Sequence, residues 1–240
     1  MKFIKNIWTG AFIEKPSLEG NYFNHIKWHH KSRLRINSIK KSNPPLYDNI
    51  TPGFLSALDK KKLKILDFGG GYGNLFFILN KCLKRKISIT VYDNSLSTIK
   101  NAKKINSKIK NITFTHNLIQ IKKKKFDLIY FGSVFQYIFD FDQINQIIKK
   151  TDAKYLIFYD LMAGDNPNFY SYQNYYKKKM LVKFYNYNFF KKNFLKIGFK
   201  IIYENKMLTQ LFGKLTKLPM QNFKNKFKVN YSKFLIMKKK

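Results

Sequence analysis

Short apolar runs and amphipathic stretches alternate along the middle of the chain. Apolar residues at helical spacing predict helices over 74–84, 95–105 and 141–150. Apolar runs rich in β-branched and aromatic residues predict strands between them. These predicted strands cover residues 63–67, 87–92, 112–115, 126–131 and 155–159. The alternation of strands with helices predicts an α/β fold with a doubly wound, mostly parallel sheet.

The last part of the chain adds two more predicted strands, at 198–203 and 228–237. A predicted helix over 188–197 precedes them, and a long connection joins them. With these two strands the predicted sheet has seven strands.

The first 60 residues differ from the rest, because they are rich in aromatic residues and show no sustained period. Pro44-Pro45 and Pro52-Gly53 are turn signals in this part. We therefore expect an irregular N-terminal cap over residues 1–60 and a main α/β domain over residues 61–240.

The charge of the chain is extreme: 47 basic and 13 acidic residues give a net charge of +34 over 240 residues. Only Arg33, Arg35 and Arg85 are arginines, and the lysines are spread from end to end. Proteins that read nucleic acids favour the planar guanidinium group of arginine. The excess of lysine over arginine is therefore better explained by codon drift in an AT-rich genome than by selection for nucleic-acid binding. Nucleic acid is therefore a disfavoured partner, although weak adhesion to polyanions is expected.

Cysteine content and hydropathy indicate in which cellular compartment the protein works. Cys82 is the single cysteine, which excludes an internal disulfide and a cysteine-built metal cluster. The sequence has no signal peptide pattern and no apolar run of the roughly 18 residues that a transmembrane helix needs. We expect a reduced, cytoplasmic setting.

The stretch LDFGGGYGN contains Gly69, Gly70, Gly71 and Gly73, from a total of 11 glycines. It lies between a predicted strand and a predicted helix, where doubly wound sheets bind ligands through backbone N–H groups. A dinucleotide site needs the pattern G-x-G-x-x-G, and here Asn74 occupies the position of the last glycine. The dinucleotide pattern therefore fails.

Two acidic residues flank this turn. Asp67 directly precedes the glycines, and Asp93 ends the next predicted strand, 20 residues after Gly73. S-adenosylmethionine (SAM) carries a ribose with two hydroxyls and cationic sulfonium and amino groups, all of which suit carboxylates. We therefore expect SAM as the cofactor.

These residues also carry a family resemblance. The sequence DFGGGYG with Asp93 resembles the first motif and second-strand acid of class I SAM-dependent methyltransferases. FDLIYFGSVFQYI at 126–138 is similar to the fourth-strand motif of that superfamily, and the last two strands are similar to its antiparallel hairpin. WTGAF at 8–12, LDFGGG, SVFQYI and FYSYQN at 169–174 together resemble a bacterial methyltransferase family associated with surface-polysaccharide gene clusters.

The resemblance implies roles for particular residues. At the end of the third strand the superfamily often has a carboxylate for the adenine amine, and this chain has Asn117 instead. Ser133 follows the fourth strand, where the superfamily contacts the methionine part of SAM. The expected cofactor-binding residues are therefore Asp67, Gly69, Gly70, Gly71, Gly73, Asp93, Asn117 and Ser133.

The molecule that receives the methyl group, the acceptor, also needs residues that bind and activate it. Tyr137, Gln173 and Asn174 are candidate substrate-binding residues, although core packing explains Tyr137 equally well. A hydroxyl acceptor benefits from a general base, and the candidates are His29 and His30 in the N-terminal segment and Asp160 at the end of the fifth strand. The histidines show no metal-ligand spacing, so we expect no metal.

The sequence therefore predicts a cytoplasmic SAM-dependent methyltransferase that acts on a hydroxyl, or less readily an amine, of a small polar acceptor. By resemblance alone, this acceptor is a nucleotide-linked or lipid-linked sugar used in polysaccharide biosynthesis. The alternatives are an RNA methyltransferase and a non-catalytic binding module with the same fold.

Overall fold

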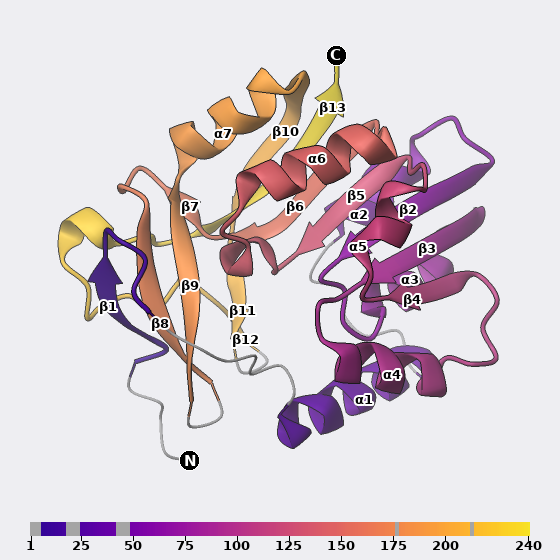
Figure 1. Ribbon diagram of the computed structural model, residues 1–240, viewed down its shortest axis with the longest axis horizontal. Helices are drawn as coiled ribbons and strands as arrows, with labels where there is room; N and C mark the ends of the chain where they lie inside the picture. Colours follow the sequence, from indigo (N-terminus) through magenta and orange to yellow (C-terminus); the bar gives the residue numbers. More distant parts are fainter. Residues whose placement is uncertain (1–5, 18–24, 42–48, 176–177, 212–213) are drawn as a thin grey trace. The chain divides into compact units, whose positions relative to one another are not determined.

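The computed structural model describes residues 6–17, 25–41, 49–175, 178–211 and 214–240. Its largest sheet has seven strands in the order β10-β13-β6-β5-β2-β3-β4 (Figure 1). These strands are β2 (Lys62–Phe68), β3 (Lys86–Tyr92), β4 (Ile112–Thr115), β5 (Leu128–Gly132), β6 (Tyr155–Leu161), β10 (Phe199–Met207) and β13 (Ser232–Lys239). β2 pairs in parallel with β3 and β5, β3 pairs in parallel with β4, and β10 and β13 are antiparallel. The predicted α/β class with a mostly parallel seven-stranded sheet is confirmed.

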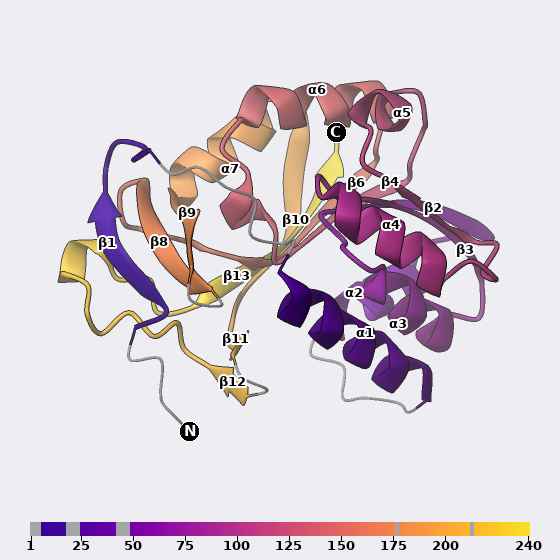
Figure 2. The same ribbon diagram turned by 60° about the horizontal axis from the view of Figure 1, so that its bottom comes forward.

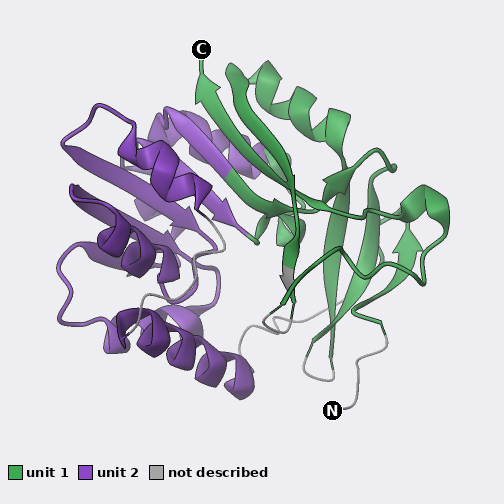
Figure 3. Cartoon of the chain, turned by 180° about the vertical axis from the view of Figure 1, so that it is seen from behind, with its two compact units in different colours: residues 1–22, 133–141, 158–240 green, residues 23–132, 142–157 purple. Residues whose placement is uncertain are grey.

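The chain divides into two compact units, shown in separate colours in Figure 3. Unit 1 contains residues 1–22, 133–141 and 158–240, and unit 2 contains residues 23–132 and 142–157. The predicted cap over residues 1–60 contributes to both units. The division at residue 60 rests on sequence composition and stays a prediction.

Unit 2 contains five helices and all but the first residue of a sixth in the described part of the chain. They are α1 (Ile26–Lys41), α2 (Ile50–Ser56), α3 (Asn74–Cys82), α4 (Leu96–Ile105), α5 (Leu118–Lys122) and α6 (Phe141–Thr151). α1 runs beside α3, while α3 packs on β3 and α4 packs on β4 (Figure 2). α6 buries Ile144, Ile147, Ile148 and Thr151, which is the spacing of a single helix face. Cys82, the last residue of α3, is exposed.

Unit 1 contains a second sheet, in the order β1-β8-β9-β7. A stacked ring pair, Phe169 and Phe184 with centroids 4.8 Å apart, lies in its core, and Trp8 meets Phe184 edge-on at 5.5 Å. The elements of this unit are β1 (Trp8–Phe12), η2 (Phe135–Tyr137), β7 (Ala163–Gly164), β8 (Phe169–Tyr175), β9 (Lys178–Asn186), α7 (Tyr187–Lys196), β11 (Thr209–Leu211), β12 (Lys214–Thr216) and η3 (Asn225–Phe227), together with β10 and β13.

The prediction of an irregular N-terminal part is wrong. This part contains β1, α1 and α2. Pro52, expected in a turn, is the third residue of α2, where the N–H that proline lacks has no partner within the helix. Pro44-Pro45 lies outside the described residues. No helix in the described ranges is long and apolar enough to cross a membrane.

Candidate functional site

The glycine turn of unit 2 joins β2 to α3. Gly69, Gly71 and Gly73 have φ angles of 74°, 56° and 80°, in the left-handed region that favours glycine. The N–H of Gly69 donates to the carbonyl of Tyr92 at 2.7 Å, which ties the turn to the end of β3. Gly73 is the N-cap of α3. The turn is therefore fixed by its backbone conformation at both ends.

Side chains are excluded at two of these glycines by the protein itself. A Cβ atom on Gly70 would overlap the Asp67 carboxylate, so the carboxylate lies directly against the backbone of the turn. A Cβ atom on Gly73 would lie 2.5 Å from Ile112 Cδ1 on β4. Gly70 therefore makes room for an acidic side chain, and Gly73 makes room for the core.

Asp67 and Asp93 lie at the carboxyl ends of β2 and β3, which are parallel neighbours. Asp67 is 2% exposed and Asp93 is 9% exposed. Burial, and then the charge of Asp93, raise the pKa of Asp67 to about 7. Burial also raises the pKa of Asp93 to about 6, although the backbone N–H groups of Ser95 and Gly71 stabilise its charge. Two buried carboxylates that disfavour each other's charge suit a ligand that brings hydrogen-bond donors or positive charge.

α1 places the Trp28 ring beside the glycine turn, which itself contains Tyr72. Trp28 and Tyr72 have ring centroids 5.7 Å apart and meet edge-on. A Cβ atom on Gly71 would make ordinary contact with Trp28 Cη2 at 3.6 Å, so the Trp28 ring lies close to the backbone there. In the sequence, an aromatic platform for a ligand and packing onto the sheet explain Trp28 equally well. Tyr72 is not indicated as a site residue, although it is a bulky residue between two of the turn glycines.

The two histidines of α1 have different surroundings. His29 is buried, its Nδ1 lies 2.9 Å from the Tyr72 hydroxyl, and its Nε2 lies 3.4 Å from Ser97 Oγ. Burial, and then the positive charge of Arg33, lower the pKa of His29. His30 is exposed. Both ring nitrogens of His29 thus have partners within unit 2.

Asn117, the expected adenine contact, is exposed and caps α5. Its Oδ1 accepts the N–H of Ile119 at 2.8 Å. This leaves the side-chain NH₂ group, which can only donate, as the part of Asn117 that suits a ring nitrogen of adenine.

Asp160 is the centre of a polar cluster in unit 1. Its Oδ2 accepts hydrogen bonds from Ser133 Oγ at 3.1 Å and Thr209 Oγ1 at 3.2 Å, and Ser232 also bonds to the carboxylate. Its Oδ1 is buried without a hydrogen-bond partner in the described part of the chain. Burial raises the pKa of Asp160 despite these hydrogen bonds. Thr209 and Ser232 come from distant parts of the chain, so no local pattern indicated them.

Asp160 and Ser133 both have an unusual backbone conformation. Their φ angles are 57° and 52°, in the left-handed region that residues with a Cβ atom seldom adopt. Such conformations persist where the surroundings hold them, and they concentrate at functional sites. The N–H of Ser133 donates to the carbonyl of Tyr159 at 2.9 Å, which fixes the two residues near each other.

The three candidate substrate residues separate into two groups within unit 1. The Tyr137 hydroxyl donates to Gln173 Oε1 at 2.9 Å, and burial raises the pKa of Tyr137 to about 12. Asn174 instead donates through Nδ2 to the carbonyl of Asn6 at 2.8 Å, and its N–H donates to the carbonyl of Ile7 at 2.8 Å. Asn174 therefore joins β8 to the residues just before β1.

Several solved structures with a similar fold are described as methyltransferases. The magnesium protoporphyrin IX methyltransferase from Synechocystis PCC 6803, solved with bound SAM, is 15% identical, covers 91% of this chain and 94% of its own, and has a TM-score of 0.55. A SAM-dependent methyltransferase from Methanosarcina mazei is 15% identical, with 78% and 97% covered and a TM-score of 0.57. One from Mesorhizobium loti is 12% identical, with 78% and 96% covered and a TM-score of 0.52. At these identities the likeness shows a shared fold.

Sequence comparison is more specific. No curated protein matches the chain. A family model described as a methyltransferase domain matches residues 59–212. The match begins just before β2 and includes the glycine turn, Asp67, Asp93 and Asp160. Because it spans more than half of the 240 residues, the chain belongs to this methyltransferase-domain family.

Proposed function

We propose that the protein is a SAM-dependent methyltransferase that methylates a hydroxyl group of a small polar acceptor. The methyl donor is S-adenosyl-L-methionine. One observation carries the proposal: the buried carboxylates of Asp67 and Asp93 lie at the ends of adjacent parallel strands. The turn beside them contains glycines whose backbone is in the left-handed region.

The residues of unit 2 fit this cofactor. Asp93 offers carboxylate oxygens to the two ribose hydroxyls, and Asp67 offers negative charge to the cationic amino-acid part. Gly71 lets the backbone approach the ligand without a side chain, and its φ of 56° is a conformation that favours glycine. When bound, SAM supplies an electrophilic methyl group on a positively charged sulfur.

For the acceptor, Asp160 is our candidate for the general base or anchor. Its Oδ1 is buried and without a partner in the described residues, and its raised pKa favours proton uptake. His29 is less suited, because Tyr72 and Ser97 occupy both of its ring nitrogens. His30 is exposed, and no contact supports a catalytic role for it. Ser133 holds Asp160 in place, and Tyr137 with Gln173 supplies polar groups to orient a hydroxylated acceptor.

A glycan precursor in the cytoplasm stays the proposed acceptor, and it rests on the sequence resemblance. The second candidate is RNA, and the net charge of +34 favours it. The two acceptors separate in a radiolabelled methyl-transfer assay with sugar nucleotides, lipid-linked sugars and RNA as substrates. Label in RNA alone would overturn the small-acceptor proposal.

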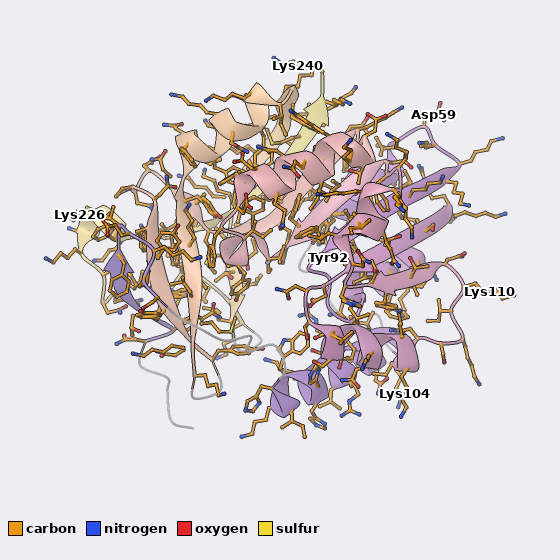
Figure 4. All side chains as sticks on the ribbon, viewed as in Figure 1. Asp59, Tyr92, Lys104, Lys110, Lys226 and Lys240 are labelled. Atoms are coloured by element: carbon orange, nitrogen blue, oxygen red, sulfur yellow. The ribbon has the colours of Figure 1, made fainter. Side chains whose placement is uncertain are left out.

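The cofactor assignment is tested by calorimetry with S-adenosylhomocysteine, the demethylated product of SAM. Asp93→Asn keeps the shape of the side chain and removes its charge, so binding should weaken about 10- to 100-fold. Asp59→Asn is the matched control, because Asp59 is exposed in the same unit (Figure 4). Unchanged affinity in Asp93→Asn would contradict the assignment.

A further inference from the structure

Unit 1 contains a pocket that none of the proposed cofactor or acceptor residues lines. Its volume is about 410 Å³, and β7, the end of β10 and residues 225–233 surround it. This volume lies within the range of about 300–1,000 Å³ that is typical of small-molecule sites. Four lysines line it, Lys206, Lys226, Lys228 and Lys233, with Asp165 as the one carboxylate among its described lining residues.

Two of these lysines are forced together by strand pairing. Lys206 of β10 lies directly opposite Lys233 of β13. Like charges directly opposite each other on antiparallel strands destabilise the pair. Lys233 has compensation, because its Nζ lies 3.0 Å from Glu204 Oε1 and 4.0 Å from the centroid of the Tyr187 ring. Lys206 forms no ion pair with any described residue.

The other two lysines come from the segment before β13. Lys226 belongs to η3 and extends from the surface there (Figure 4), and Lys228 follows it. Lys228 Nζ donates to Asn225 Oδ1 at 3.1 Å, a neutral acceptor that leaves its charge uncompensated. Three separate parts of the chain therefore bring excess positive charge to one pocket.

Asn166, also in the lining, offers an acceptor. It is 6% exposed, and its Oδ1 is buried without a partner in the described residues. Its Nδ2 donates to the carbonyl of Pro167 at 2.8 Å, and its own carbonyl accepts Asn186 Nδ2 at 3.0 Å, so the residue is held in place. A buried acceptor without a partner is costly unless a ligand donates to it.

We propose that this pocket binds a small molecule that carries a phosphate or diphosphate group together with a hydroxyl. The phosphate oxygens interact with Lys206, Lys226 and Lys228, and the hydroxyl donates to Asn166 Oδ1. Lysine binds phosphate as a point charge, and a volume of about 410 Å³ is the size of a small-molecule site. The inference does not depend on methyl transfer, since the two sets of residues differ.

The test uses calorimetry with inorganic pyrophosphate on the 240-residue chain. We expect saturable binding that weakens about tenfold or more in the double variant Lys206→Gln/Lys228→Gln. The matched control is Lys104→Gln/Lys110→Gln, which removes the same charge from exposed positions of unit 2 (Figure 4) and should change the affinity less than about twofold. Absence of saturable binding, or equal losses in the two double variants, would overturn the proposal.

Two further arms refine the result. Glucose 1-phosphate should bind more tightly than inorganic phosphate, because its hydroxyls can donate to Asn166, and equal affinities would overturn the role of Asn166. If a short RNA binds with a steep salt dependence and loses affinity in Lys206→Gln/Lys228→Gln while pyrophosphate does not, the pocket is a polynucleotide site and the proposal is wrong. Binding of S-adenosylhomocysteine should be unaffected in this double variant, which separates the pocket from the proposed methyltransferase function.

Discussion

Burial raises the pKa of Asp67 to about 7 and the pKa of Asp93 to about 6, so both carboxyls change charge near neutral pH. Their charge therefore depends on the ligand as well as on pH. A ligand that donates hydrogen bonds or carries positive charge favours the ionised forms and lowers both pKa values. The cost of burying the two carboxylates in the free protein is thus offset when the ligand binds.

The affinity for S-adenosylhomocysteine should consequently rise with pH. Between pH 5.5 and 7.5 we expect about a tenfold gain or more, because protonation of either carboxyl competes with binding at the lower pH. Calorimetry at several pH values checks this, and Asp67→Asn should remove the upper part of the rise. An affinity that is constant over this range would mean that neither carboxylate contacts the ligand.

The same residues make the free protein less stable at high pH. The folded-state pKa of Asp67 lies above its usual value of 3.8, so its contribution to stability is present at low pH and is lost as pH rises through about 7. Asp67→Asn should therefore raise the free energy of unfolding at pH 8 by about 2 kcal/mol without cofactor, while it weakens cofactor binding. Urea unfolding measures the change, with Asp59→Asn as a control that should change little.

Two glycines allow a matched test of packing. Gly73→Ala should lower the free energy of unfolding by about 2 kcal/mol or more, because the new Cβ meets Ile112 Cδ1 at 2.5 Å and the residue has a φ of 80°. Gly53→Ala lies in α2, where the new Cβ would meet no described atom of another element within 4 Å, and it should instead raise this free energy by about 0.5–1 kcal/mol. Equal effects in thermal unfolding would show that the turn tolerates a side chain.

Among the elements, α1 is the one that covers the glycine turn, and this provides a spectroscopic signal. The chain has two tryptophans, Trp28 on α1 in unit 2 and Trp8 in the core of unit 1. Binding of S-adenosylhomocysteine next to Gly71 should change the fluorescence of Trp28. We expect Trp28→Phe to remove this change and Trp8→Phe to preserve it, and the opposite pattern would rule out a ligand site beside α1.

The sequence predicted the elements whose periodicity is set by burial. The five strands from 63 to 159 and their helices are observed within a few residues, because the two buried faces of a parallel sheet require continuous apolar runs. β8 and β9 were missed, since Tyr170, Tyr172 and Asn174 give β8 a polar, half-exposed face. α1 was missed because basic residues dominate it. Site residues were predicted where a local sequence motif contains them, as for Asp67 and Asp93. Thr209 and Ser232 were not predicted, because only the fold brings them to Asp160.

On the scale of the whole molecule, charge repulsion opposes folding. The chain has 47 basic against 13 acidic residues, so most lysines lack a carboxylate partner; Lys60 with Asp127 and Lys233 with Glu204 are ion pairs of the described residues. Salt screens the repulsion among exposed lysines more than it weakens so few ion pairs. Raising NaCl from about 20 to 300 mM should therefore stabilise the protein by about 1 kcal/mol, or raise its Tm by about 2–4 °C. A fall in Tm in a salt series by calorimetric scanning would contradict this.

Cys82 offers one further use of the architecture. It is the single thiol of the chain, it is exposed in unit 2, and Trp8 is buried in unit 1. In the Trp28→Phe variant, Trp8 is the one remaining tryptophan. A dye coupled to Cys82 can accept excitation energy from it, and the transfer efficiency then depends on the distance between the two. A shift in transfer efficiency on adding S-adenosylhomocysteine would then report a change in the distance between the dye and Trp8.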